Sequence, residues 1–113
     1  MTLARYQMCI DGQWVDAQSG NTFESLDPAR AQAWAVLPDA GAEDVQRAVQ
    51  AAQAAFDNPA WRGLSATARG KLLRRLGDLI AENKEALAQL ESRDNGKLLS
   101  LIHISEPTRQ EAI

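Results

Sequence analysis

The first third of the chain alternates apolar and polar residues, which is the pattern of strands with one face against a core. Within residues 6–15 the alternation is interrupted by Asp11 and Gly12, a pair that tolerates the positive φ angles of a tight type I′ turn. This segment therefore predicts a β-hairpin.

Two more strands are expected after the hairpin. A turn signal at residues 19–21 leads into a strand over residues 22–26, which ends before Pro28 because proline has no N–H to give to a ladder. The next strand covers residues 32–37 and ends at Pro38 for the same reason. We expect these strands and turns to lie at or near a surface.

From Gly41 onward, apolar residues recur every three or four positions, which is the period of an α-helix. A first helix is expected over residues 42–56, and it ends before Pro59. Glu43 and Asp44 occupy its first turn, where acidic side chains interact favourably with the helix dipole. Its apolar face consists of Val45, Ala48, Val49, Ala52 and Phe56.

A second helix is predicted over residues 65–81, with Ser65 as its N-cap. Its apolar stripe consists of Leu72, Leu73, Leu76, Leu79 and Ile80. Asn83 is placed to cap a third, shorter helix, which ends at Gly96 because glycine readily adopts the left-handed conformation. The predicted order is four strands followed by three helices, and the amphipathic second helix must pack on something.

Composition favours a soluble globular chain of about one small domain, with 45% apolar and 24% charged residues among 113. The formal charge is −3, and the 12 basic residues are interleaved with 15 acidic ones, so nucleic acid is not an expected partner. No window is long and apolar enough to cross a membrane. With one cysteine and no leader-like apolar run at the start, the chain is predicted to be cytoplasmic.

The character of the sequence changes after Leu98. Residues 99–109 agree with the direct translation of the mosaic-end adapter used in transposase-based sequencing libraries. We therefore interpret residues 99–113 as an adapter-derived, non-native tail, and residues 1–98 as the truncated N-terminal part of a longer protein. A native C-terminal strand is the alternative. The only histidine, His103, lies in this tail and is given no role.

The sequence contains no motif that couples residue spacing to phosphate, zinc or acyl chemistry, so no catalytic or cofactor-binding residue is predicted in it. Cys9 is expected to be a small, half-buried strand residue, because neither a histidine nor a helix N-terminus lies near it in the sequence to activate it. Asp94 precedes Gly96 at a helix C-terminus, where backbone carbonyls collect. A carboxylate beside carbonyls suits a hard cation, although a simple helix stop is the alternative reading.

Several segments, taken in order, resemble the N-terminal portion of the aldehyde dehydrogenase superfamily. They are Ile-Asp-Gly-Gln-Trp-Val at 10–15, Ser-Gly-Asn-Thr-Phe-Glu at 19–24, Asp-Pro-Ala at 27–29, the helix at 43–52 with Phe56 and Trp61, Arg-Gly-Lys-Leu-Leu-Arg-Arg-Leu at 69–76, and Leu-Glu-Ser-Arg-Asp-Asn-Gly-Lys at 90–97. The turn at Asp27 departs from the family, which has asparagine there and Thr-Gly where this chain has Arg30 and Ala31.

The resemblance implies an α/β fold, in which an N-terminal hairpin and strand segment joins helices of a Rossmann-like coenzyme-binding domain, here truncated. It implies a homo-oligomeric full-length enzyme that oxidises a small aldehyde with NAD or NADP. In the family a cysteine thiolate attacks the aldehyde and a glutamate-activated water releases the acid. Those residues would lie beyond Leu98, and Cys9 matches none of them.

The resemblance also implies a structural monovalent cation. Its ligands would be backbone oxygens of Ser25 and Leu26 together with the carboxylate of Asp94. A function of another class remains open, namely a small non-enzymatic α+β binding or scaffold module that presents the Leu72–Ile80 face to a partner. A cysteine, a glutamate and a nucleotide-binding region downstream in the uninterrupted gene would discriminate between the two.

Overall fold

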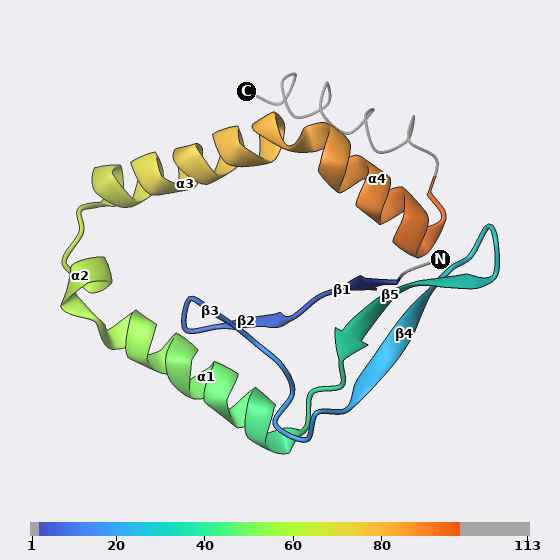
Figure 1. Ribbon diagram of the computed structural model, residues 1–113. Coiled ribbons are helices and arrows are strands. Elements are labelled where there is room, and N and C mark those ends of the chain that lie inside the picture. Colours follow the sequence, from blue (N-terminus) through green and yellow to red (C-terminus); the bar gives the residue numbers. More distant parts are fainter. Residues whose placement is uncertain (1–2, 98–113) are drawn as a thin grey trace.

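The computed structural model describes residues 3–97, and in this range the chain is an α/β assembly of five strands and four helices (Figure 1). The elements are β1 (Ala4–Arg5), β2 (Met8–Ile10), β3 (Gln13–Val15), β4 (Thr22–Asp27), β5 (Gln32–Pro38), α1 (Ala42–Asp57), α2 (Pro59–Arg62), α3 (Ala66–Glu82) and α4 (Lys84–Asn95). The predicted α/β class is confirmed, as is the order of its main elements.

The hairpin of β2 and β3 forms as the sequence predicts. The two strands pair antiparallel, with Ile10 opposite Gln13. Asp11 and Gly12 have φ angles of 53° and 73°, so both central residues of the turn are left-handed, as a type I′ turn requires. Ile10 is buried.

The other three strands form one sheet in the order β1-β5-β4, in which β4 and β5 are antiparallel and β1 is parallel to β5. Strand β1 is not predicted from the sequence because two residues are too few to show alternation. The register of β4 against β5 shifts between Ser25, opposite Ala35, and Leu26, opposite Ala33. Trp34 is thus the extra residue of a β-bulge.

The three predicted helices are present, and most of their ends are set as expected. Ser65 Oγ accepts a hydrogen bond from the N–H of Ala68 at 3.1 Å and caps α3. Gly96 ends α4 in the left-handed conformation, with a φ of 76°. The short helix α2 is not predicted; it begins where the side chain of Asn58 accepts a hydrogen bond from the N–H of Ala60.

Asn83 occupies the N-cap position of α4 as predicted, but its side chain does not cap that helix. Its side chain makes no capping bond to α4; instead Nδ2 donates to the carbonyl of Leu79 at 2.8 Å, within the last turn of α3. The reason lies in the backbone. Asn83 joins two helices with φ −105° and ψ 16°, outside the extended conformation from which an N-cap side chain reaches the next helix.

The chain is flat and open. Its extents are 48 × 43 × 18 Å and its radius of gyration is 17.8 Å, against about 13 Å for a compact domain of some 100 residues. The four helices and the β4–β5 pair form the outline of the chain, and β1, β2 and β3 lie inside this outline (Figure 1). The buried apolar residues are Ile10, Ala17, Ala35 and Ala88. No helix in the described range is both long and apolar enough to span a membrane.

Candidate functional site

The C-terminal end of α4 meets the end of β4, and this junction brings together two of the three residues expected to hold a cation. Ser25 Oγ donates a hydrogen bond of 2.5 Å to Asp94 Oδ1, across 69 positions of sequence. Gly96 lies against Pro28, because a Cβ on this glycine would be 3.5 Å from the Pro28 Cβ. The left-handed turn at Gly96 therefore allows the end of α4 to approach the turn after β4.

Leu26, the third expected ligand, lies beside Ser25 where the register of β4 shifts. Its side chain is 56% exposed. This position is compatible with a role for its backbone carbonyl, which is the role that the resemblance implies. A β-bulge interrupts the regular ladder, so backbone groups near it are less uniformly committed to the neighbouring strand.

The polar atoms at this junction are mainly oxygens. Besides the Asp94 carboxylate and the Ser25 hydroxyl, the carbonyl of Lys97 is nearby in sequence and accepts a 2.6 Å hydrogen bond from Ser92 Oγ. The C-terminal end of a helix carries partial negative charge, which a cation offsets. Within residues 3–97 no group of three or more histidine, cysteine, aspartate or glutamate side chains could hold a metal. A carboxylate beside backbone oxygens is the donor chemistry that a hard monovalent cation uses.

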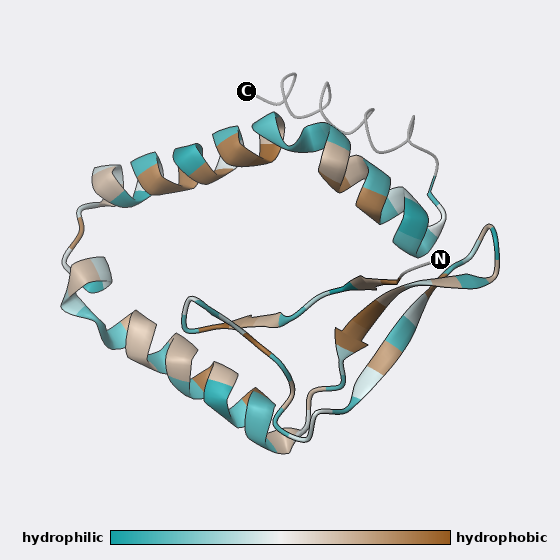
Figure 2. Cartoon of the chain, in the orientation of Figure 1, coloured by the Kyte–Doolittle hydropathy of each residue, from teal (hydrophilic) through white to brown (hydrophobic). Residues whose placement is uncertain are grey.

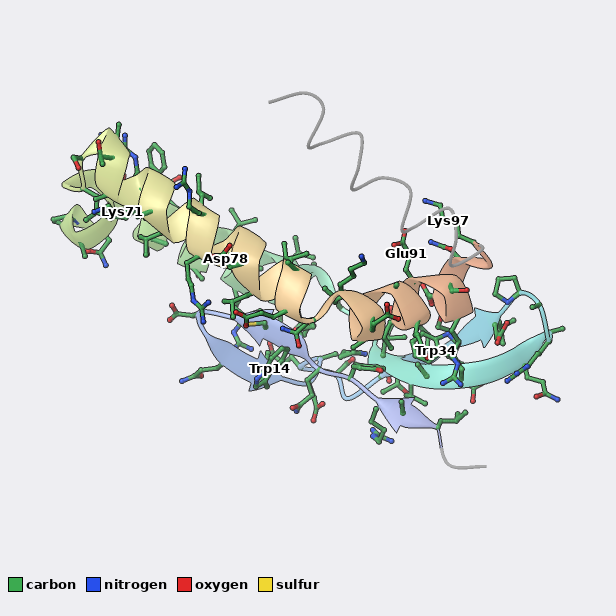
Figure 3. All side chains as sticks on the ribbon, turned by 90° about the horizontal axis from the view of Figure 1, so that it is seen from above. Trp14, Trp34, Lys71, Asp78, Glu91 and Lys97 are labelled. Carbon is green, nitrogen blue, oxygen red and sulfur yellow. The ribbon has the colours of Figure 1, made fainter. Side chains whose placement is uncertain are left out.

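Trp34 lies between this junction and β1. The Arg93 guanidinium carbon is 5.7 Å from the centre of the Trp34 ring, and the Tyr6 ring meets Trp34 edge to face at 6.0 Å. The Trp34 indole N–H is buried and has no hydrogen-bond partner among the described residues. In Figure 3, Trp34 lies where α4 crosses β5, and Lys97 lies beyond the end of α4. The contacts of Trp34 with Tyr6 and Arg93 are not predicted from the sequence, because a β-bulge leaves no periodic pattern in it.

An open pocket of about 310 Å³ lies between β5 and α4. Its lining is mostly apolar and consists of Tyr6, Trp34, Ala35, Leu37, Leu90, Glu91 and Asp94. These aliphatic and aromatic residues form a lining against which an apolar side chain of a partner segment would be buried.

Asp44 is one of two buried carboxylates among residues 3–97, the other being Asp27, and its structural role goes beyond the predicted one. It is 2% exposed. One oxygen accepts a 3.1 Å hydrogen bond from the N–H of Gln18, and the other accepts a 2.9 Å bond from the N–H of Gly41. Asp44 thus joins the segment after β3 to the start of α1. From the third helical position Asp44 reaches back to the N-cap N–H, which is one half of a capping box; Gly41 has no side chain to supply the other half.

The prediction that Cys9 is half-buried is wrong, because the thiol is exposed. Strand alternation puts Ile10 on the buried side of β2 and Cys9 on the other, opposite Trp14, which is itself 71% exposed. His103 lies outside the described residues.

The first turns of α1 and α3 already have partners for N–H groups that a dinucleotide would use. A pyrophosphate commonly binds free N–H groups at a helix N-terminus. At the start of α1 the Gly41 N–H is already bonded to the Asp44 carboxylate, and Glu43 adds a second negative charge. At the start of α3, Ser65 caps the helix. No step of a redox reaction is therefore assigned to residues 3–97.

The sequence model of the "Aldehyde dehydrogenase family" matches residues 14–108. Aldehyde dehydrogenase 1 of Tanacetum cinerariifolium is 46% identical over 91 residues, which are 80% of this chain and 18% of that protein. The match to the family runs past residue 98, and the origin of residues 99–113 stays a prediction.

Solved structures of aldehyde dehydrogenases also match the fold of this chain. The NAD-dependent aldehyde dehydrogenase of Sinorhizobium meliloti has a TM-score of 0.84 at 38% identity, covering 89% of this chain and 20% of that one. The aldehyde dehydrogenase of Bacillus cereus, solved as an NAD+ complex, has a TM-score of 0.82 at 41% identity, covering 86% and 20%. The chain thus spans about a fifth of the length of the relatives it matches. On its sequence, and on a fold that matches the N-terminal part of these coenzyme-binding domains, this chain belongs to the aldehyde dehydrogenase family.

Proposed function

We propose that this chain is the N-terminal part of an NAD(P)-dependent enzyme that oxidises a small aldehyde to a carboxylate. The observation that carries the proposal is the family match together with its extent, about a fifth of each relative. One of the similar structures is of an NAD-dependent enzyme, and another holds NAD+. We further propose a cytoplasmic, homo-oligomeric full-length protein, as the resemblance and the single cysteine suggest.

In the proposed enzyme the catalytic cysteine, the glutamate that activates water and the dinucleotide site all lie beyond Leu98. Two properties of the described residues support placing the catalytic residues and the dinucleotide site beyond Leu98. Cys9 is exposed on the outer side of a hairpin, and the α1 N-terminus is occupied by Asp44. The contribution of this segment is then a scaffold, which presents helix faces and a strand junction to the rest of the domain.

We also propose that Ser25 and Leu26, through backbone oxygens, and Asp94, through its carboxylate, hold a monovalent cation. The 2.5 Å contact of Ser25 with Asp94 supports the proposal because it brings the Asp94 carboxylate at the end of α4 next to the backbone of β4 at Ser25 and Leu26. Such a cation would offset the charge of Asp94 and the partial charge at the end of α4. Its role would be to fasten the helix to the sheet.

The test of the enzymatic proposal is to clone the gene together with its downstream sequence and express the complete protein. We expect aldehyde-dependent formation of NADH or NADPH by that protein, and none by the 113-residue chain alone, which lacks a nucleophile held by a base and a dinucleotide site. A complete protein without a downstream cysteine, glutamate and nucleotide-binding region would contradict the proposal. The exposed Leu72–Ile80 face of α3 would then favour the non-enzymatic binding module.

A further inference from the structure

Two arginines from separate elements line the same two pockets beside the junction of β4 and α4. Arg30 lies in the turn between β4 and β5, and Arg93 lies in the last turn of α4. One pocket has a volume of about 110 Å³ and the other about 290 Å³, and both arginines line each of them. Figure 2 shows that the end of α4 beside β4 is hydrophilic, unlike the apolar pocket between β5 and α4.

The charges of these two arginines are not balanced by an ion pair. Neither guanidinium forms one within residues 3–97, whereas Arg62 pairs with Asp57 at 3.5 Å. Among the described residues that line the two pockets, Asp27 is the only one with a carboxylate, and its Oδ1 accepts a 2.9 Å hydrogen bond from the N–H of Ala29. Like charges around one pocket repel each other, and an anion bound between them removes this repulsion.

Trp34 supports Arg93 from below. The guanidinium carbon of Arg93 lies over the Trp34 ring, 5.7 Å from its centre. A guanidinium stacked on an aromatic face keeps the N–H donors in its plane available for an anion. The buried indole N–H of Trp34 has no acceptor within residues 3–97 either. Hydrogen-bond donors without acceptors therefore gather at this place.

Hydrogen bonds hold the turn in which Arg30 lies. The carbonyl of Asp27 accepts from the N–H groups of Arg30 and Ala31, at 3.2 and 2.8 Å. Ala31 has a φ of 54°, a left-handed conformation that is uncommon for a residue other than glycine. The family pattern has Thr-Gly where this chain has Arg30 and Ala31, so the arginine is a feature of this chain and not of the pattern. A strained backbone of this kind often accompanies a functional constraint.

We propose that Arg30 and Arg93 form a binding site for a phosphate group, either free phosphate or a phosphate monoester. The planar guanidinium presents paired N–H donors that match two oxygens of a phosphate. A phosphate monoester carries about two negative charges at neutral pH, which balance two guanidinium groups, whereas a single carboxylate balances one. This site is separate from the proposed oxidation of an aldehyde and does not depend on it.

The experiment follows amide hydrogen exchange by mass spectrometry in the complete protein, with inorganic phosphate and phenyl phosphate as probes. We expect both probes to slow exchange in segments 27–34 and 88–95, relative to sodium chloride of the same ionic strength. Tighter binding of phenyl phosphate would support the site and identify a monoester as its ligand, and tighter binding of inorganic phosphate would support it with free phosphate as the ligand. Equal slowing by chloride, or slower exchange only in other segments, would overturn the inference.

Variants of the two arginines test which groups bind the probe. Arg30→Thr, which introduces the residue of the family pattern, should weaken the phosphate affinity by roughly tenfold, because a charge-assisted hydrogen bond is lost. Arg93→Gln should weaken it to a similar degree. The matched control is Arg74→Gln, which removes an arginine from an exposed position on α3 and should leave the affinity unchanged. Circular dichroism checks that all three variants keep their helices. Unchanged affinity in either Arg30→Thr or Arg93→Gln would overturn the inference.

Discussion

Asp44 is the less exposed of the two buried carboxylates among residues 3–97. Its carboxylate is nearly inaccessible to solvent and accepts hydrogen bonds from the N–H groups of Gln18 and Gly41. Replacing a carboxylate by alanine leaves both donors without a partner, and a hydrogen bond to a charged group contributes about 1.5–3 kcal/mol.

We expect Asp44→Ala to lower the exchange protection of the Gln18 and Gly41 amides by roughly tenfold or more, because a tenfold change corresponds to about 1.4 kcal/mol. Hydrogen exchange measured in the complete protein checks this, because the isolated chain is not expected to hold a fixed tertiary structure. The control is Asp16→Ala, since Asp16 is exposed and accepts only from the side chain of Gln7. Equal protection in the Asp44→Ala variant and the original chain would show that the buried carboxylate does not hold the two segments together.

The second prediction at this scale concerns Asp94. The variant Asp94→Asn keeps an acceptor for Ser25 but removes the charge that a cation needs. In the complete protein with the original sequence, replacing potassium and sodium by choline at constant ionic strength should speed amide exchange at the end of α4. In Asp94→Asn the same replacement should have no effect.

The control for that experiment is Glu91→Gln, which changes a carboxylate on the same helix that pairs with Lys97 at 3.4 Å. This variant should respond to choline as the original chain does. If Asp94→Asn responds in the same way too, the contact between Ser25 and Asp94 is a simple hydrogen bond and the helix-stop reading of Asp94 is sufficient.

Among the elements, α3 has a well-defined start. Ser65 Oγ accepts from the Ala68 N–H and satisfies one of the first free donors of the helix. We expect Ser65→Ala to destabilise the first turn of α3 by about 1 kcal/mol, the usual loss for an N-cap. Faster exchange of the Ala68 amide and a small loss of helical dichroism would report it. Ser65→Asp retains an acceptor and should behave like the original chain; a loss as large as that of Ser65→Ala would contradict the capping role.

The elements that sequence patterns predict are those long enough to repeat a period. Helices α1 and α3 show several turns of apolar spacing, and the hairpin has the Asp11-Gly12 turn. Strand β1 and helix α2 have two and four residues, too few to show a period. Asn83 could be read as a cap from its type alone, but its backbone conformation decided which helix it serves.

The candidate site was predictable only in part. The left-handed turn at Gly96 follows from the sequence, and it places Asp94 at a helix end. The contact with Ser25 spans 69 positions and comes from the resemblance rather than from any local pattern. The bulge at Trp34 and the Arg93 contact depend on the pairing of two strands and a helix, so no local signal announces them.

For the whole molecule, the open shape is the feature with the largest energetic consequence. Full burial of a large apolar side chain contributes roughly 1.5–3 kcal/mol, whereas ordering each residue costs about 1.5 kcal/mol. In the described chain most large aliphatic residues of α1, α3 and α4 are more than a third exposed. We therefore infer that these residues are one wall of a larger domain.

Calorimetry of the isolated chain, combined with apolar-dye binding, near-ultraviolet dichroism and light scattering, tests that claim most directly. The account predicts a helical far-ultraviolet signal with weak near-ultraviolet dichroism, binding of the dye, a tendency to associate and no sharp heat absorption peak. A monomer that unfolds in one sharp cooperative transition and binds no dye would contradict it, since such a chain would close a core of its own and have no need of the remaining enzyme.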